Sequence, residues 1–374
     1  MSSQRFNPSR SIQYVSARGE TKFKLISSRI SEFTLQELGY ARMKAEKEAG
    51  IKFGIRVFTV DQLFLCANFL PITRASFSFR FGKISPDETL YTTIHTKGKV
   101  EYVANTRNLS AIAAFSKKSK FTTHIHLPDI KNLDADKAAA FQRHMKRLLF
   151  SRAFVLHFNL DRVISFHLPV SQRHEPVAFA TDFLLLVDAA MRQGILKGVK
   201  VAVEPYAGPA ADLPEFREPH VWMKMFTRRQ GEPLNPNIGM IIDPTHIAIY
   251  GDYKASDFIK LVNENNIPIM GFHLHGSEGR DDAHVFPVPW NVEDFGELIT
   301  LINDARDAGK ARPVTVELSR DIFLGMNIET LAENMNELMR RVYPDKLLKR
   351  HHRLLRDELI RLSAKAREEY SQSA

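Results

Sequence analysis

The sequence predicts an α/β protein, a (β/α)₈ barrel with an N-terminal extension and a basic C-terminal helix. After residue 120, six short apolar segments alternate with helical stretches, a pattern typical of parallel strands joined by crossover helices. No strand is followed by GxGxxG or GxxxxGK[ST], the glycine-rich loops of open nucleotide-binding sheets. The chain has 374 residues, 44% of them hydrophobic, which is enough for a large core. Six such units and one or two earlier strands favour a closed barrel.

The first 50 residues are predicted to form a polar leader followed by a helix over Glu32–Glu48, which Gly50 ends. The leader has no apolar h-region and does not resemble a signal peptide. Apolar side chains recur in the helix at roughly helical spacing, at Leu35, Leu38, Ala41 and Ala45. We expect three parts: the leader and helix over 1–50, the barrel over 51–341 and a basic helix over 342–374.

Residues 51–120 are rich in β-branched and aromatic side chains, which favours strands over Ile51–Val60, Ala75–Phe81 and Val100–Ala104. Tyr91–Val103, interrupted by Lys97-Gly98-Lys99, has the pattern of a hairpin. The sequence leaves open which of these segments are the first two barrel strands.

The strand–helix alternation after residue 120 fixes the remaining elements. The predicted strands are Phe121–Leu127, Ala153–Phe158, Val199–Glu204, Ile238–Asp243, Ile267–His273 and Pro313–Leu318. The predicted helices lie near 134–150, 177–196, 216–229, 254–265, 291–309 and 328–341. The tail from Tyr343 to Ala374 is expected to be one basic helix with an apolar stripe. It either packs on the barrel exterior or binds a nucleic acid or a protein partner.

Charge is concentrated at the two flanks of the chain. Residues 1–60 carry 11 Lys and Arg against 5 Asp and Glu, and residues 340–374 carry 10 against 5. The net charge is +9, so the barrel between them is close to neutral. Basic flanks attract polyanions such as DNA, although a solvated helix face explains them equally well. With a single cysteine, Cys66, and no apolar run of membrane-spanning length, we expect a cytoplasmic protein without a membrane partner. The oligomeric state stays open.

Nearly every predicted barrel strand after residue 120 ends in a side chain that can bind a metal ion. In a parallel barrel these strand ends meet at one face, where active sites form. Buried imidazoles and carboxylates are costly unless a counter-charge compensates them, and a cluster of divalent cations supplies it. The donors are nitrogen and oxygen only, which suits a cluster of zinc, manganese or iron ions. The candidates are His124, His126, His157, Glu204, Asp243, His246, His273, His275, Asp281, Asp282, His284 and Glu317.

Residues 121–318 resemble endonuclease IV, the metal-dependent abasic-site endonuclease, within the xylose isomerase-like TIM barrel superfamily. The resemblance is carried by short ordered motifs. They are His126-Leu-Pro-Asp-Ile-Lys-Asn-Leu133, Val155-Leu-His157, Val201-Ala-Val-Glu-Pro-Tyr-Ala-Gly208, Gly239-Met-Ile-Ile-Asp-Pro-Thr-His246, Gly271-Phe-His-Leu274, Asp282-Ala-His284 and Val314-Thr-Val-Glu317.

The resemblance implies a trinuclear zinc site and phosphodiester hydrolysis on DNA. His126, His157 and Glu204 would hold one metal. Glu204 would bridge to a second, completed by Asp243, His273 and Glu317. His246, Asp282 and His284 would hold the third. Glu204 and Glu317 are the expected catalytic carboxylates, and His275, Arg280 and Asn132 the expected substrate contacts.

The chain also departs from this family. His275-Gly276 stands where the family has Asn-Asp, and Asp129-Ile130 puts an acid where the family inserts a wedge into DNA. Two alternatives therefore stay open. In a sugar isomerase or epimerase, Glu204 and Glu317 would exchange a proton with a metal-bound carbohydrate. In a multinuclear non-haem iron oxidative enzyme acting on a peptide, residues 1–120 would recognise the substrate.

Overall fold

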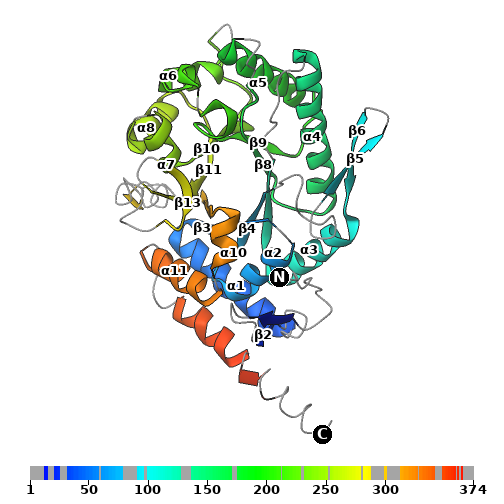
Figure 1. Ribbon diagram of the computed structural model, residues 1–374, viewed down its shortest axis with the longest axis vertical. Helices are drawn as coiled ribbons and strands as arrows, with labels where there is room; N and C mark the ends of the chain where they lie inside the picture. Colours follow the sequence, from blue (N-terminus) through cyan, green and yellow to red (C-terminus); the bar gives the residue numbers. More distant parts are fainter. Residues whose placement is uncertain are drawn as a thin grey trace.

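The computed structural model is a closed barrel of eight parallel strands with helices on its outside (Figure 1). The structure describes residues 12–15, 21–25, 32–58, 60–78, 91–96, 99–127, 136–170, 175–211, 213–228, 231–251, 253–278, 281–287, 299–300, 312–326, 328–341, 348–358, 360–361 and 364. The predicted (β/α)₈ fold is confirmed.

The barrel strands follow one another around the ring in chain order, and every neighbouring pair is parallel. Most residues of these strands are buried, including all five residues of β10. The strands are β3 (Ile51–Val57), β4 (Arg74–Ser78), β7 (Thr122–His126), β8 (Val163–Phe166), β9 (Lys200–Val203), β10 (Ile238–Ile242), β11 (Ile269–Leu274) and β14 (Arg312–Val316).

The structure settles which early segments enter the barrel. They are β3 and β4, whereas β5 (Tyr91–Thr96) and β6 (Lys99–Ala104) form the predicted antiparallel hairpin outside it. Two further antiparallel pairs lie outside the ring, β1 (Ile12–Val15) with β2 (Thr21–Leu25), and β12 (Gly276–Glu278) with β13 (Asp281–Val285). Residues 51–57 and 74–78, which the oxidative-enzyme alternative assigned to substrate recognition, are therefore barrel strands.

Helices cover the outside of the strands, as crossover connections in a parallel barrel require. Among the described helices, none combines the length and the hydropathy needed to cross a membrane. The longer ones are α1 (Glu32–Ala49), α2 (Val60–Phe69), α3 (Thr106–Ser119), α4 (Lys137–His157), α5 (Pro176–Arg192), α6 (Pro219–Met225), α8 (Ala255–Glu264), α10 (Arg320–Gly325) and α11 (Ile328–Arg340). Short turns are η2 (Gly208–Ala210), η3 (Pro214–Phe216), α7 (Pro244–His246) and η4 (Ile247–Gly251). The helix predicted near 291–309 lies almost wholly outside the described residues.

One predicted strand is wrong. Residues 153–158 are the end of α4, and the fourth barrel strand is β8, which follows five residues after that helix. The apolar run Ala153–Leu156 fits a buried strand and a helix equally well when taken alone. Over the longer window, the buried positions of α4 recur every three or four residues, at Ala140, His144, Leu148, Ser151 and Val155.

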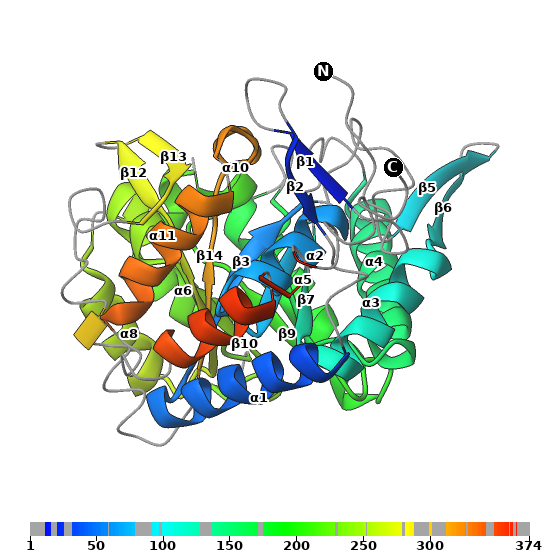
Figure 2. The ribbon, with the colours of Figure 1, turned by 90° about the horizontal axis from the view of Figure 1, so that it is seen from below.

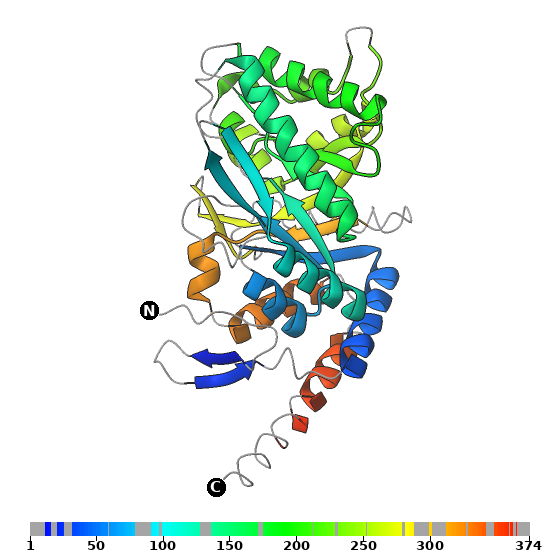
Figure 3. The same cartoon turned by 90° about the vertical axis from the view of Figure 1, so that its right-hand side faces the viewer.

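The described part of the basic tail packs on the outside of the barrel. Residues 348–358 are helical and lie beside α1, at the end of the barrel opposite the β12–β13 hairpin (Figures 2 and 3). The guanidinium of Arg42 contacts His351 Nε2 at 3.2 Å, and Thr34 Oγ1 donates to Glu358 Oε2 at 3.1 Å. This packing agrees with the simpler of the two interpretations of the tail.

Candidate metal centre

The metal-capable side chains gather at the carboxyl ends of the barrel strands. His126 is the last residue of β7, and Glu204, Asp243 and Glu317 come directly after β9, β10 and β14. His273 lies near the end of β11. Each of these five side chains is at most 2% exposed, so their charges must be balanced inside the protein.

Glu204 is the centre of the arrangement. Its Oε2 lies 2.8 Å from His273 Nδ1 and 3.3 Å from His167 Nε2, and its Oε1 lies 3.1 Å from His246 Nδ1. The two oxygens therefore face two different sets of imidazoles. A carboxylate in this position can bridge two metal ions.

Glu317 is held by an arginine from the first barrel strand. Arg56 Nη1 donates to Glu317 Oε2 at 2.7 Å, and Glu317 Oε1 lies 3.3 Å from His273 Nδ1. Burial alone would raise the pKa of Glu317, but Arg56 and His273 lower it to about 2. Glu317 is thus a permanent carboxylate with one oxygen left for a cation.

His126 is oriented by a serine on the neighbouring strand. Ser165 Oγ, in β8, lies 2.7 Å from His126 Nδ1 and 2.8 Å from His124 Nε2, and both rings are fully or almost fully buried. When His126 Nδ1 donates to this hydroxyl, Nε2 keeps its lone pair for a metal. Burial lowers the pKa of His126 to about 3, so the ring is neutral at pH 7.

The two carboxylate oxygens of Asp243 have different contacts: one caps a helix and the other faces the cluster of donors. Oδ1 accepts from the backbone N–H groups of Thr245 and His246, at 2.9 and 3.2 Å, and so caps the short helix α7. Oδ2 lies 3.3 Å from His275 Nε2 and 3.9 Å from His246 Nδ1. The cap fixes the carboxylate while leaving Oδ2 directed at the cluster.

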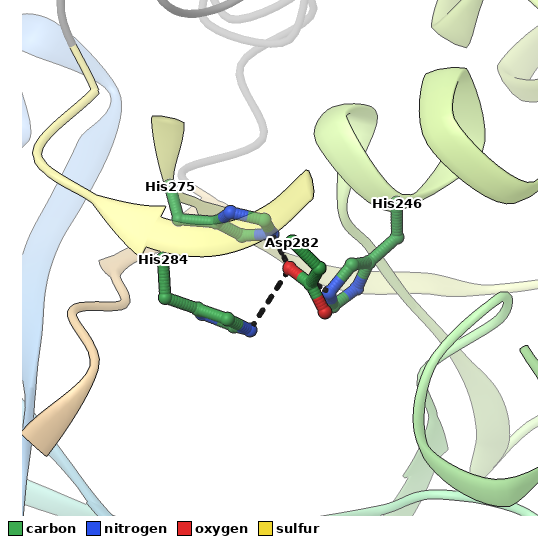
Figure 4. Close-up of side chains that lie close together, drawn as sticks. All are labelled: His246, His275, Asp282 and His284. Carbon is green, nitrogen blue, oxygen red and sulfur yellow. Dashed lines mark ion pairs between the residues drawn. The ribbon is translucent and has the colours of Figure 1, made fainter. Parts of the chain in front are cut away.

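A second group of donors lies where the β12–β13 hairpin meets α7 (Figure 4). Asp282 Oδ1 is within 3.3–3.6 Å of three imidazole Nε2 atoms, those of His246, His275 and His284. The rings of His275 and His284 stack with centroids 4.0 Å apart. His284 has φ 48°, a left-handed backbone that non-glycine residues adopt at a cost. We call His246, His275, Asp282 and His284 the distal group.

These residues fit divalent cations. Within the described residues, three sets of donors lie close enough to share an ion: the distal group, His126 with Glu204 and His273, and Glu204 with Asp243 and His246. Buried donor atoms here lack a hydrogen-bond partner, unlike most buried polar atoms in folded proteins. They include Asp243 Oδ2, His273 Nε2, His275 Nε2, Asp282 Oδ1 and Glu317 Oε1. Such atoms, close together but not hydrogen-bonded, are what a shared cation would satisfy.

The structure does not bring His157 to this centre. It ends α4 with an exposed side chain, in a cavity that it shares with Lys52 and Thr122 near the beginnings of β3 and β7, at the other end of the barrel. His167, which follows β8, occupies the expected place: its ring lies 4.8 Å from that of His126 and its Nε2 contacts Glu204. The sequence signal for His167 is the short run Val163–Phe166, which is apolar except for Ser165 and is followed directly by this histidine.

Glycine 208 shows how closely the chain packs against His167. Gly208 has φ 63°, and a Cβ atom there would lie 2.6 Å from His167 Nδ1. Only glycine lets the loop after β9 approach this ring. His275, expected to contact substrate, lies inside the distal group, whereas Asn132, Arg280 and Asp129-Ile130 lie outside the described residues.

No family model matches the chain, and no curated protein matches it either. Solved structures do. It is similar to the IOLI protein with a binding zinc atom (TM-score 0.56, 11% identity, 79% of this chain and 100% of that one). It is also similar to D-psicose 3-epimerase in the presence of D-fructose, with a TM-score of 0.51 and 13% identity over 78% of this chain and 99% of that one. A xylose isomerase domain protein from Alicyclobacillus acidocaldarius gives a TM-score of 0.51 and 15% identity over 81% of this chain and 99% of that one. A family 2 AP endonuclease from Brucella melitensis gives a TM-score of only 0.45, at 14% identity. The chain thus shares the TIM barrel fold of these proteins, and identities this low show the fold alone.

Proposed function

We propose that this protein is a metal-dependent phosphodiesterase with a centre of two or three divalent ions, zinc foremost. DNA with an abasic site is the substrate to test first. The observation that supports this most is the position of Glu204, whose two oxygens face separate sets of donors. Paired cation sites that share a carboxylate suit in-line displacement at a phosphodiester.

Bound divalent ions would lower the pKa of water and neutralise charge on the phosphate. The chain's own part is to fix the donors. Glu204 stays ionised, because its contacts with His273, His167 and His246 lower its pKa in spite of burial. His126 stays neutral and is held by Ser165. Because the donors come from separate strand ends of a rigid barrel, their spacing does not depend on substrate.

The Arg56–Glu317 pair weakens the isomerase alternative. Proton exchange between Glu204 and Glu317 requires carboxyls that gain and lose a proton near the working pH. Glu317 is instead held as a carboxylate by Arg56 Nη1 at 2.7 Å, with a pKa lowered to about 2. A permanent anion suits a metal ligand better than a general base or acid.

The basic tail gives little support to DNA binding. Arg340 and Arg341 lie 3.6 and 3.7 Å from Glu337, and Arg350 contacts Glu37 of α1. These charges are partly neutralised, and the helical segment 348–358 lies at the end of the barrel away from the β12–β13 hairpin (Figure 2). The proposal of a phosphodiester substrate therefore depends on the metal centre, not on the flanks.

A second candidate is a multinuclear non-haem iron oxidative enzyme acting on a peptide. The observation that favours it is the richness of the centre in imidazole: the distal group alone has three histidines and one aspartate. Imidazole suits iron as well as zinc.

The test is elemental analysis of the purified protein, together with nicking of a DNA duplex that carries one abasic site. Two or three equivalents of zinc and nicking that a chelator abolishes support the phosphodiesterase. Glu204→Gln should lose both metal and nicking, and His220→Ala, an exposed histidine 61% accessible, should lose neither. Iron without nicking supports the oxidative enzyme, and a protein that binds no divalent metal contradicts both.

A further inference from the structure

The distal group contains one histidine more than the resemblance to endonuclease IV predicts. His246, Asp282 and His284 were expected as ligands, and His275 joins them with its Nε2 3.6 Å from Asp282 Oδ1. Its side chain is fully buried, and Nε2 has no hydrogen-bond partner. A neutral nitrogen in that situation has given up water without a compensating bond.

The three donor–donor distances that involve Asp282 are close to the edge of a tetrahedron around zinc. With zinc–nitrogen and zinc–oxygen bonds of about 2.0–2.1 Å, two ligands of a four-coordinate zinc lie about 3.3 Å apart, and two adjacent ligands of a six-coordinate ion about 3.0 Å. The three nitrogen–oxygen distances to Asp282 Oδ1 are 3.3, 3.4 and 3.6 Å. These separations favour the four-coordinate arrangement.

The backbone fixes the form of His275 that can act as a ligand. His275 Nδ1 lies 3.1 Å from the carbonyl oxygen of Gly276, which can only accept, so Nδ1 carries the proton. Nε2 is then the unprotonated nitrogen and points toward Asp282, as Figure 4 shows. Imidazoles that bind metal commonly donate their other N–H to a carbonyl in this way.

Two other features hold the group together. Thr245 Oγ1 donates to the carbonyl oxygen of His275 at 2.6 Å, which ties α7 to the end of β11. The ring of His284, a residue with φ 48°, also stacks on the ring of His275 with centroids 4.0 Å apart.

We propose that His275 is the fourth protein ligand of the distal metal, so that His246, His275, Asp282 and His284 form a closed tetrahedral zinc site. This inference rests on the proposed metal centre and narrows its chemistry. A site with four protein ligands has no open position for water or substrate and acts structurally. The distal metal would join the β12–β13 hairpin to α7, and substrate would meet only the ions held around Glu204.

His275 Nε2 also lies 3.3 Å from Asp243 Oδ2, which gives the proposal a specific competitor. If His275 belonged to the ion near Asp243, its loss would remove that ion and leave the distal one. Visible absorption of cobalt separates the two cases, because four-coordinate Co²⁺ absorbs much more strongly than five- or six-coordinate Co²⁺.

The experiment uses the full chain, stripped with a chelator and titrated with Co²⁺, with bound metal counted after gel filtration. We expect one cobalt with the intense tetrahedral spectrum. In His275→Ala and His275→Asn that spectrum should be lost and the count should fall by one, as in His284→Ala, whereas His220→Ala should match the wild type. Equal melting temperatures of the metal-free proteins exclude misfolding.

An unchanged tetrahedral spectrum in both His275 variants would overturn the inference, and so would loss of a weakly absorbing ion with the tetrahedral one retained. The titration needs no substrate. A wild-type chain that shows the tetrahedral cobalt but does not nick abasic DNA would therefore refute the phosphodiesterase and leave the closed site standing.

Discussion

His167→Ala should weaken the metal site that contains His126 and Glu204, whereas His157→Ala should leave it unchanged. His167 Nε2 lies 3.3 Å from Glu204 Oε2, and its ring lies 4.8 Å from that of His126. His157 is exposed at the end of α4, on the other side of the barrel. The two variants are a matched pair, since each removes one imidazole from the same part of the chain.

The expected size follows from what each ring contacts. Loss of a residue that only supports a ligand weakens metal binding about 10–100-fold. His167 is expected to bind directly, so the dissociation constant of this site should rise at least ~100-fold, or about 2.8 kcal/mol. An exposed substitution such as His157→Ala should change stability by no more than about 0.5 kcal/mol.

The assay is competition with a chromogenic zinc chelator, followed by counting the zinc that remains after gel filtration. We expect one equivalent fewer in His167→Ala and the full count in His157→Ala. If His157→Ala lost the equivalent and His167→Ala kept it, the assignment of the fourth strand's ligand would be wrong. Equal losses in both variants would point to a general effect on folding and would also count against it.

Three further predictions follow from the contacts. Ser165→Ala should raise the dissociation constant of the His126 site for zinc about 10–100-fold, because the Ser165 hydroxyl lies 2.7 Å from His126 Nδ1 and orients that ring. Ser165→Thr, which keeps the hydroxyl, is the control. Zinc affinity in the alanine variant equal to that of the wild type would contradict this role. Zinc binding should release protons at pH 7, because carboxylates raise the pKa of His246 and His273 in spite of burial, and each must be deprotonated to bind. Zinc affinity should accordingly fall as pH decreases, and calorimetric heats that do not depend on the buffer's ionisation enthalpy would disprove it. Burial raises the pKa of Glu46 from 4.5 to about 8, so the folded state binds the carboxyl proton of Glu46 more tightly than the unfolded state does. The free energy of unfolding therefore decreases as pH rises between those two values. Glu46→Gln should therefore gain melting temperature progressively from pH 5 to pH 8, and a constant difference would refute the assignment.

Most barrel strands could be predicted because their signal is local. The strands β9, β10, β11 and β14 are short, mostly apolar runs between helical stretches, and β7 lies in the predicted strand Phe121–Leu127. Each has a metal-capable residue near or just past its end. Parallel strands in a barrel place those ends at one face whatever the side chains. For this reason Glu204, Asp243 and Glu317 could be assigned to a common centre before their distances were known.

The fourth strand could not be placed in this way. Ala153–Leu156 and Val163–Phe166 are four-residue runs, apolar except for Ser165, and a histidine follows each. A run of four residues carries too little periodicity to separate a helix from a strand. Only the packing of α4 along its whole length decides between them. Because the strand was assigned to the first run, His157 and not His167 was predicted to lie at the strand end.

By itself, the sequence determined the fold class, the chemical kind of the donors and the strand ends that carry them, because hydrophobic periodicity and residue type are properties of short stretches of chain. Tertiary structure alone decided which donors share an ion. Arg56 and Glu317 are 261 positions apart and meet through the adjacent strands β3 and β14. His275 joins the distal group because a hairpin brings Asp282 and His284 back against it. Such contacts arise when the barrel closes, and no local pattern encodes them.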